Sequence, residues 1–228
     1  MKKNVVQSPY YQVVYEDGGN RYEGELHNNK RHGVGVFVSQ NGEKYEGYWD
    51  NNIKKGFGKY TFSNGDTFVG NFEQNKPNGH CKMDYLLSGN TYEGQWKDGK
   101  ASGQGILNFT SEQRVLKGEF WYCELHGFGQ LTSSTIKYIG EFRHCEYDGF
   151  GKLEDNELMQ RYVGMFKQDK MDGQGVLMDQ RNAILFSGLW REGRKHGQGR
   201  QTNFAADQSI TGAWQNDMLT FVENFGKI

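Results

Sequence analysis

The stretch YEGELHNNKRHGVGVF, Tyr22 to Phe37, decides the fold because the chain repeats it. Eight residues later, YEGYWDNNIKKGFGKY runs from Tyr45 to Tyr60 with the same order of parts. Each copy has an aromatic-x-Gly triplet, a second large apolar residue, a short polar segment and a Gly-x-Gly. Self-similarity at a fixed period predicts a chain built by stacking one small unit many times.

The repeat continues along most of the chain. The first glycine recurs at intervals of 22 to 24 residues, a mean period of about 23.5. The residues two before and two after this glycine are apolar in every unit, and a second glycine follows nine residues after each of the first eight. The nine anchor glycines are Gly24, Gly47, Gly70, Gly94, Gly118, Gly140, Gly164, Gly188 and Gly212.

This spacing predicts β-hairpins. Residues at i, i+2 and i+4 share one face of a strand, whereas they would scatter around a helix. The polar segments carry Asn-Asn, Asp-Gly or Glu-Gly pairs, which suit the positive φ angles of a two-residue turn. The expected fold is all-β: an elongated, single-layer antiparallel meander of about 18 strands, on the order of 85 Å long.

The glycines are expected to seat the aromatic rings. A glycine inside a strand often marks the close approach of another group. We expect rings to lie flat on the bare Gly-x-Gly backbone of a neighbouring strand, and Gly103 to be one such seat.

Three segments follow from the repeat. Residues 22–217 form the array of nine units, and residues 1–21 are predicted to be a half-unit with a leading strand. In residues 218–228 the two glycine positions become Phe221 and Glu223, so this segment is predicted to cap the array.

Composition narrows the function classes. The chain has 27 basic and 28 acidic residues in 228, well mixed, so no global field attracts nucleic acid. No run approaches the roughly 18 apolar residues of a membrane span. Three cysteines, an odd number, without an apolar signal segment near Met1 favour a reducing, cytoplasmic location.

No reaction is predicted. Gly-x-Gly recurs in most units without a following helix, unlike a nucleotide-binding loop. Cys123 and Cys145 hold equivalent turn positions about 10 Å apart, too far for a disulfide and loose for zinc. His32, His126 and His196 share one repeat position and form no catalytic set. We therefore expect no enzyme activity, cofactor, metal or small-molecule substrate.

The pattern resembles the MORN (membrane occupation and recognition nexus) repeat family. The units YEGEL…GVG, YEGYW…GFG, YEGQW…GQG and FSGLW…GQG carry the resemblance most clearly, while Cys81 and Leu116 depart from the pattern. The resemblance implies a gently curved scaffold or adaptor sheet. Because the family includes ciliary radial-spoke and cell-cortex proteins, it also implies protein partners in a multi-subunit cytoskeletal assembly, with a cilium or axoneme as the expected location.

The face opposite the glycines holds the first candidate binding site. Its residues are free of the ring-on-glycine rule, yet several are apolar, and contiguous exposed apolar surface usually marks an interface. The alternative is that the chain's own tails cover this face. The candidate protein-binding residues are Val34, Tyr48, Phe57, Phe128, Ile139, Phe150, Val163 and Met165.

Two other surfaces remain open. If the chain covers the first face itself, the partner site is expected in an aromatic groove at Tyr45, Trp49, Tyr92, Trp96 and Trp190. A row of cations near the turns is a possible contact for anionic phospholipid, although acidic residues in the same turns favour a solvated, mixed-charge edge. That row contains Lys30, Lys76, Lys100, Lys170 and Arg194, with Lys54 and Lys55 nearby.

Overall fold

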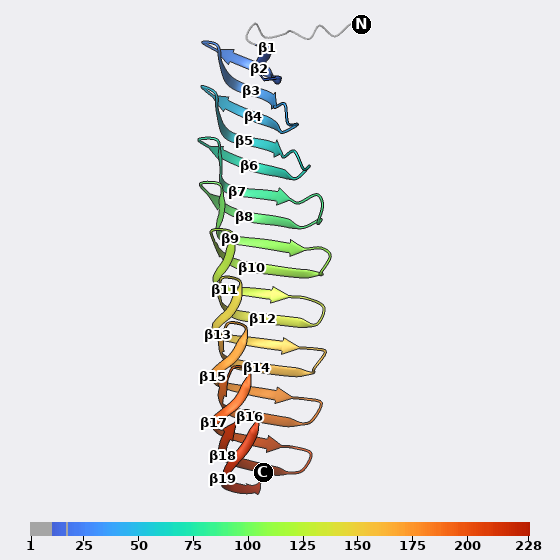
Figure 1. Cartoon of the computed structure of the whole chain (residues 1–228), viewed down its shortest axis with the longest axis vertical. Coiled ribbons are helices and arrows are strands. Elements are labelled where there is room, and N and C mark those ends of the chain that lie inside the picture. Colours follow the sequence, from blue (N-terminus) through green and yellow to red (C-terminus); the bar gives the residue numbers. More distant parts are fainter. Residues whose placement is uncertain (1–10, 17) are drawn as a thin grey trace. The chain divides into compact units, whose positions relative to one another are not determined.

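The computed structural model describes residues 11–16 and 18–228, and within them it contains strands and no helix. The chain divides into two compact units, Met1–Ser111 and Glu112–Ile228. Each is an antiparallel meander in which every strand pairs with the strand next to it in sequence (Figure 1). The all-β meander predicted from the repeat is confirmed.

The strands of the first unit, within its described residues, are β1 Tyr11–Glu16, β2 Asn20–His27, β3 Lys30–Val38, β4 Lys44–Asp50, β5 Ile53–Thr61, β6 Thr67–Glu73, β7 Lys76–Asp84, β8 Thr91–Lys97 and β9 Lys100–Phe109. Those of the second unit are β10 Arg114–Trp121, β11 Glu124–Thr132, β12 Ile136–Arg143, β13 Glu146–Asp155, β14 Gln160–Lys167, β15 Lys170–Asp179, β16 Ile184–Arg191, β17 Arg194–Asn203, β18 Gln208–Gln215 and β19 Met218–Lys227.

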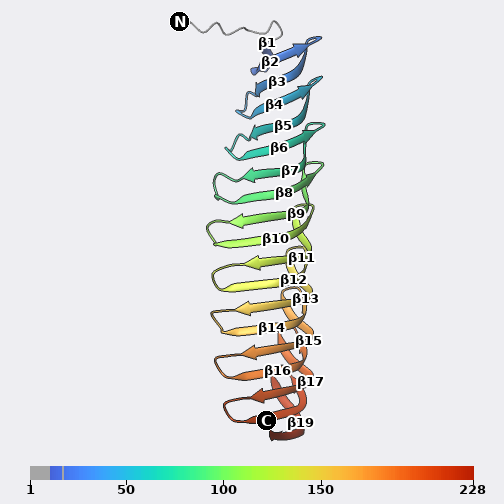
Figure 2. The ribbon, with the colours of Figure 1, turned by 180° about the vertical axis from the view of Figure 1, so that it is seen from behind.

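Two kinds of connection alternate along each meander. Two-residue turns close the hairpins at one edge, and longer connections join successive hairpins at the other (Figure 2). The turn residues have left-handed φ angles, as at Asn28 (51°) and Asn29 (58°), which asparagine tolerates better than most residues. The predicted turn chemistry therefore matches the backbone.

The glycines form one continuous row across the strands of each unit. In the first unit Gly24 pairs with Gly35, and Gly35 pairs with Gly47 on its other side. Cys81 fills the same row between Gly70 and Gly94. The row lies under the rings: a Cβ on Gly35 would stand 2.3 Å from Oη of Tyr22.

The two glycines of each Gly-x-Gly have different roles, which corrects the expectation for Gly103. That residue has a φ of +91°, and an added Cβ would meet Oε1 of Gln95 rather than a ring. The ring of Tyr92 instead covers Gly105 and Gly94. The first glycine lies where the pairing of the two strands is irregular. Gly94 pairs with Gly105, but Trp96, two residues further, pairs with Ala101 rather than with Gly103.

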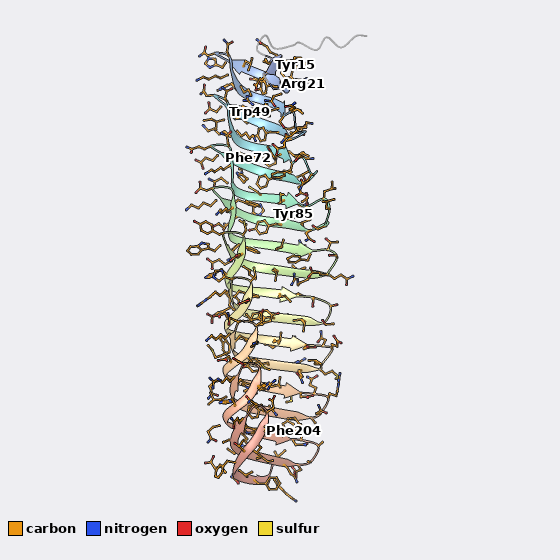
Figure 3. The ribbon with its side chains drawn as sticks, in the orientation of Figure 1. Tyr15, Arg21, Trp49, Phe72, Tyr85 and Phe204 are labelled. Carbon is orange, nitrogen blue, oxygen red and sulfur yellow. The ribbon has the colours of Figure 1, made fainter. Side chains whose placement is uncertain are left out.

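The core is a file of rings on one face of the sheet. Tyr45 meets Trp49 and Phe72 edge to face, with centroids 5.0 and 5.1 Å apart. Trp49 and Phe72 lie on successive hairpins over the ribbon (Figure 3). The second unit repeats the arrangement, with Tyr162 against Phe166 at 5.0 Å. Each ring pair adds roughly 0.5–1.5 kcal/mol beyond the area it buries.

The tyrosine hydroxyl groups donate hydrogen bonds to backbone carbonyl groups beside the glycine row. Tyr22 donates to the carbonyl of Glu25 at 2.9 Å, and Tyr138 donates to that of Glu141 at the same distance. Burial raises the pKa of Tyr22 to about 12. The hydroxyl therefore stays protonated and able to donate over the ordinary pH range.

Candidate functional site

The candidate protein-binding residues lie on the face opposite the ring file, because strand side chains alternate between faces. All are exposed except Ile139, which is half-buried. The structure divides them into separate groups. In the first unit Val34 faces Tyr48, whereas Phe57 faces the polar Asn71.

In the second unit the apolar residues are contiguous on β13 to β16. Phe150 faces Met165, and Val163 faces Val176. Leu189 faces Gln174, which places it diagonally from Val176 and within side-chain reach. We call Phe150, Val163, Met165, Val176 and Leu189 the outer patch; their side chains are between 36% and 55% exposed.

Two members of the outer patch were missed from the sequence. Both residues follow from the same alternation once the register is known. Val176 lies two residues after Gln174 on β15, and Leu189 on β16 lies directly across from Gln174. The structure also separates Phe128 from the outer patch. Phe128 faces Glu141, whose carboxylate accepts a hydrogen bond from the backbone of Phe150 at 3.0 Å.

Cations border the outer patch at the turn ends of the same strands. Lys167 lies directly opposite Lys170, and Arg191 directly opposite Arg194. All four are exposed, and within the described residues no ion pair neutralises them. Like charges facing each other across a ladder destabilise a hairpin, so these positions are costly for the isolated protein.

The predicted basic row is only partly present. Lys30, Lys76 and Lys100 are exposed at the turn edge, and Lys55 pairs with Asp50 at 2.9 Å. Lys54 points to the other face, with Nζ 4.1 Å from the ring centroid of Tyr60, and burial lowers the pKa of its ammonium to about 8. Lys54 is therefore unavailable to a membrane at this edge.

The alternative aromatic groove is filled by the protein itself. Tyr45, Trp49, Tyr92 and Trp190 are at most 4% exposed, and Trp96 is half-buried. They pack edge to face against one another and over the glycine row, so these rings offer no open surface to a partner. Four of these five rings are therefore packed inside the ring file, and a partner site at this groove remains a prediction.

Within the described residues, neither a metal-binding cluster nor a membrane-spanning helix is present. There, no three or more His, Cys, Asp or Glu side chains are grouped so that they could hold a metal ion. No helix in that part of the chain is long and apolar enough to cross a membrane.

Two solved structures are similar to this chain at low sequence identity. The TCP domain of SAS-4 (dCPAP) of Drosophila melanogaster, in complex with a proline-rich motif of Ana2 (dSTIL), is 12% identical over 79% of this chain and 90% of its own, with a TM-score of 0.41. The G-box domain of the microcephaly protein CPAP is 16% identical over 78% and 91%, with a TM-score of 0.46. These values carry no functional argument.

No curated protein sequence matches the chain. The MORN repeat family model does match, at residues 22–44, 45–67, 68–85, 92–114, 162–180 and 186–202. The matched segments cover more than half of the sequence and coincide with hairpins that carry the ring, the glycine row and the two-residue turn. The chain belongs to the MORN repeat family.

Proposed function

We propose that the protein is a non-catalytic scaffold whose outer patch binds an acidic, amphipathic helix of a partner protein. The proposal rests on two neighbouring features of one face. Five exposed apolar side chains lie on β13 to β16, and two pairs of cations without an acidic partner among the described residues lie at the ends of β14 to β17. MORN repeats are a non-catalytic repeat type, and a binding role needs no further group.

The outer patch supplies the apolar part of the interface. Burying one exposed aromatic or aliphatic anchor stabilises a complex by about 2 kcal/mol when it enters a well-packed site. Phe150 is the largest such side chain here and is 55% exposed. Contact with a partner removes this apolar surface from water, which is the main driving force for association.

The cation pairs determine the chemistry of the partner. Strands lie about 4.8 Å apart, so the pair Lys167 and Lys170 is followed after about 10 Å by the pair Arg191 and Arg194. A helix that crosses the strands rises about 10.5 Å in seven residues. Acidic residues seven apart would meet both pairs, while the adjoining apolar stripe would cover Met165, Val163 and Val176.

A designed peptide tests this geometry. The probe is a helix of about 21 residues with an apolar stripe and Glu at every seventh position along one border, labelled for fluorescence anisotropy. We expect Phe150→Ser with Met165→Ser to weaken binding at least tenfold. The matched control is Val34→Ser with Phe57→Ser, which removes apolar groups of the first unit that are more exposed than Phe150 and Met165.

Reversing the charge of one cation in each pair provides a second test of the same geometry. Lys167→Glu with Arg191→Glu should weaken binding of the Glu peptide and create binding of the same peptide with Lys at those positions. If the control and the outer-patch variants lose affinity equally, or if the Glu and Lys peptides bind the unchanged protein alike, the proposal is wrong.

Anionic phospholipid is the rival ligand, favoured by the same cation pairs and by Lys97 opposite Lys100. Flotation with phosphatidylcholine vesicles, with and without phosphatidylserine, separates the two. Salt-sensitive flotation that Lys167→Glu abolishes, and that Phe150→Ser leaves intact, would favour the membrane adaptor. Absence of flotation together with retained peptide binding favours the scaffold.

We place the scaffold in a multi-subunit cytoskeletal assembly, with an axonemal radial spoke in the cytoplasm of a cilium as the specific proposal. Family resemblance supports this proposal. Fractionation of axonemes tests it: the protein should remain with the axoneme after detergent extraction and co-purify with spoke components. Recovery in the detergent-soluble fraction would contradict it.

A further inference from the structure

The turn edge of β10 to β12 contains a hollow that neither the ring file nor the outer patch uses. It has a volume of ≈ 290 Å³ and is lined by Trp121, Tyr122, Glu124, His126 and His144. Trp121 and Tyr122 are 62% and 61% exposed. This volume suits a single large side chain rather than a helix.

Four of the five lining residues carry aromatic rings. Trp121 and Tyr122 are stacked with centroids 6.0 Å apart and planes 26° apart. His126 stands 6.1 Å from Trp121 and 5.7 Å from His144. The face of an aromatic ring is its negative region, which attracts cations.

A carboxylate completes the lining. Nδ1 of His144 lies 2.7 Å from Oε2 of Glu124, so the imidazole donates to this oxygen and helps to fix the carboxylate. Both groups are exposed, and His144 carries a full charge only when protonated. The hollow therefore combines ring faces with a negative group, the opposite of the cation pairs on β14 to β17.

Two turns at this edge begin with an aromatic residue. Tyr122 and His144 open their turns with φ angles of 51° and 52°, where the other hairpins place Asn, Asp, Gln or Glu, as at Asn28, Gln74 and Glu192. A bulky residue in the left-handed region strains the backbone. These turns also fall in residues 115–161, which the family model does not match, although the hairpins persist. Such local departures from a repeat are typical of functional positions.

We propose that this hollow binds the guanidinium group of an arginine side chain presented by a partner protein. The planar group stacks on Trp121 while its N–H groups donate to Glu124, a geometry that arginine matches better than the compact ammonium of lysine. An anionic group would meet the carboxylate and the ring faces together. The site is independent of the outer patch.

Short peptides test the proposal on the full chain. Acetyl-Gly-Arg-Gly-amide is titrated while the indole signal of Trp121 is followed by NMR, with Trp121→Phe identifying that signal. The comparison peptide contains citrulline, which keeps the size and planarity of the side chain, has no charge and carries a carbonyl oxygen in place of one nitrogen donor. We expect the arginine peptide to bind at least tenfold more tightly than the citrulline peptide.

Two variants locate the binding. Glu124→Gln should reduce the affinity for the arginine peptide about tenfold and remove the preference over citrulline. Glu146→Gln is the matched control because Glu146 holds the same position on the next hairpin, opposite Arg143, and should leave both affinities unchanged. Equal binding of the two peptides, no shift of the Trp121 signal, or equal effects of the two Glu variants would overturn the proposal.

Discussion

At the scale of single residues, the fold depends on which glycine lies under a ring. The second glycine of each Gly-x-Gly touches the ring and has an extended backbone, whereas the first has a left-handed φ and touches no ring. Gly105 and Gly103 are neighbouring examples: 2.3 Å separates an added Cβ on Gly105 from Oη of Tyr92. Essentially no real Cβ contact is that short.

We predict that Gly105→Ala destabilises the protein by about 2 kcal/mol or more, because the buried Tyr92 ring must move and lose its contacts. Urea unfolding followed by circular dichroism measures the change. Gly226→Ala is the control, since nothing lies within 4 Å of its added Cβ. Gly103→Ala should cost roughly 1 kcal/mol, mainly through backbone strain, because the exposed Gln95 side chain can move away from the added Cβ. Equal stability of the Gly105 and Gly226 variants would refute the ring-on-glycine account.

The sequence predicted the rings and the glycines but could not tell the two glycines apart. Period-two alternation places both on one face. The difference arises from the irregular register, in which Gly94 pairs with Gly105 but Trp96 pairs with Ala101. The residue types near Gly103 do not predict this register shift, because glycine is compatible with both the left-handed and the extended backbone conformation.

At the scale of elements, hydrogen bonds at the two-residue turns connect each hairpin to the next hairpin. The backbone N–H of Asn52 donates to the carbonyl of Arg31 at 2.9 Å, and the Asn52 side chain accepts from the Arg31 N–H at 2.7 Å. Asp169 makes the same pair of contacts to Tyr147. Cys145 replaces that side-chain oxygen with its Sγ, 3.2 Å from the N–H of Leu125.

We predict that His144→Asn stabilises the protein by about 0.5–1 kcal/mol, because asparagine tolerates the left-handed φ of 52° better than histidine. The lost contact to Glu124 is exposed and worth little by comparison. The urea midpoint measures the gain. The reverse change, Asn51→His at φ 50°, should destabilise by a similar amount. A loss of stability in His144→Asn would contradict the argument.

The outer patch marks the limit of prediction at this scale. Phe150, Val163 and Met165 were predicted because aromatic or aliphatic residues stood where polar ones were expected. Their contiguity, and the separation of Phe128 by Glu141, depend on which residues face each other across strands. One sequence does not specify that register when glycine irregularities shift it in every hairpin. Lys170 and Arg194 belong to the predicted basic row, but their pairing with Lys167 and Arg191 depends on the same register.

At the scale of the whole molecule, buried ionisable groups in both units couple stability to pH. Burial raises the pKa of Tyr22, Tyr45 and Tyr60 in the first unit to about 12, and that of Tyr147 in the second to about 12. Burial lowers the pKa of Lys54 to about 8. The tyrosine hydroxyl groups and the lysine amine therefore change the free energy of unfolding in opposite directions as the pH rises. The pH range in which the lysine acts gives way near pH 10 to the range in which the tyrosines act.

The sign for each group follows from the number of protons bound in each state. Between pH 8 and about 10.5, unfolded Lys54 holds a proton that the folded protein has released, so the free energy of unfolding rises with pH. Between pH 10 and about 12, the folded tyrosines keep protons that the unfolded chain loses, so the free energy of unfolding falls. The lysine contribution is about 1 kcal/mol after allowance for partial exposure.

We therefore predict that the melting temperature rises between pH 8 and pH 10 and falls steeply above pH 10. In Lys54→Met the rise should become smaller, because within the described residues only one amine whose pKa burial lowers, that of Lys195, remains to lose its proton. The melting temperature of this variant at pH 7 should increase, since a desolvated charge is replaced by an apolar side chain. Lys55→Met removes an exposed cation paired with Asp50 and should keep the rise. Thermal unfolding at a series of pH values measures all three proteins. If Lys54→Met and the unchanged protein gave parallel curves from pH 7 to pH 10, the amine would not be buried against Tyr45 and Tyr60, and the ring file would be open to water at β5.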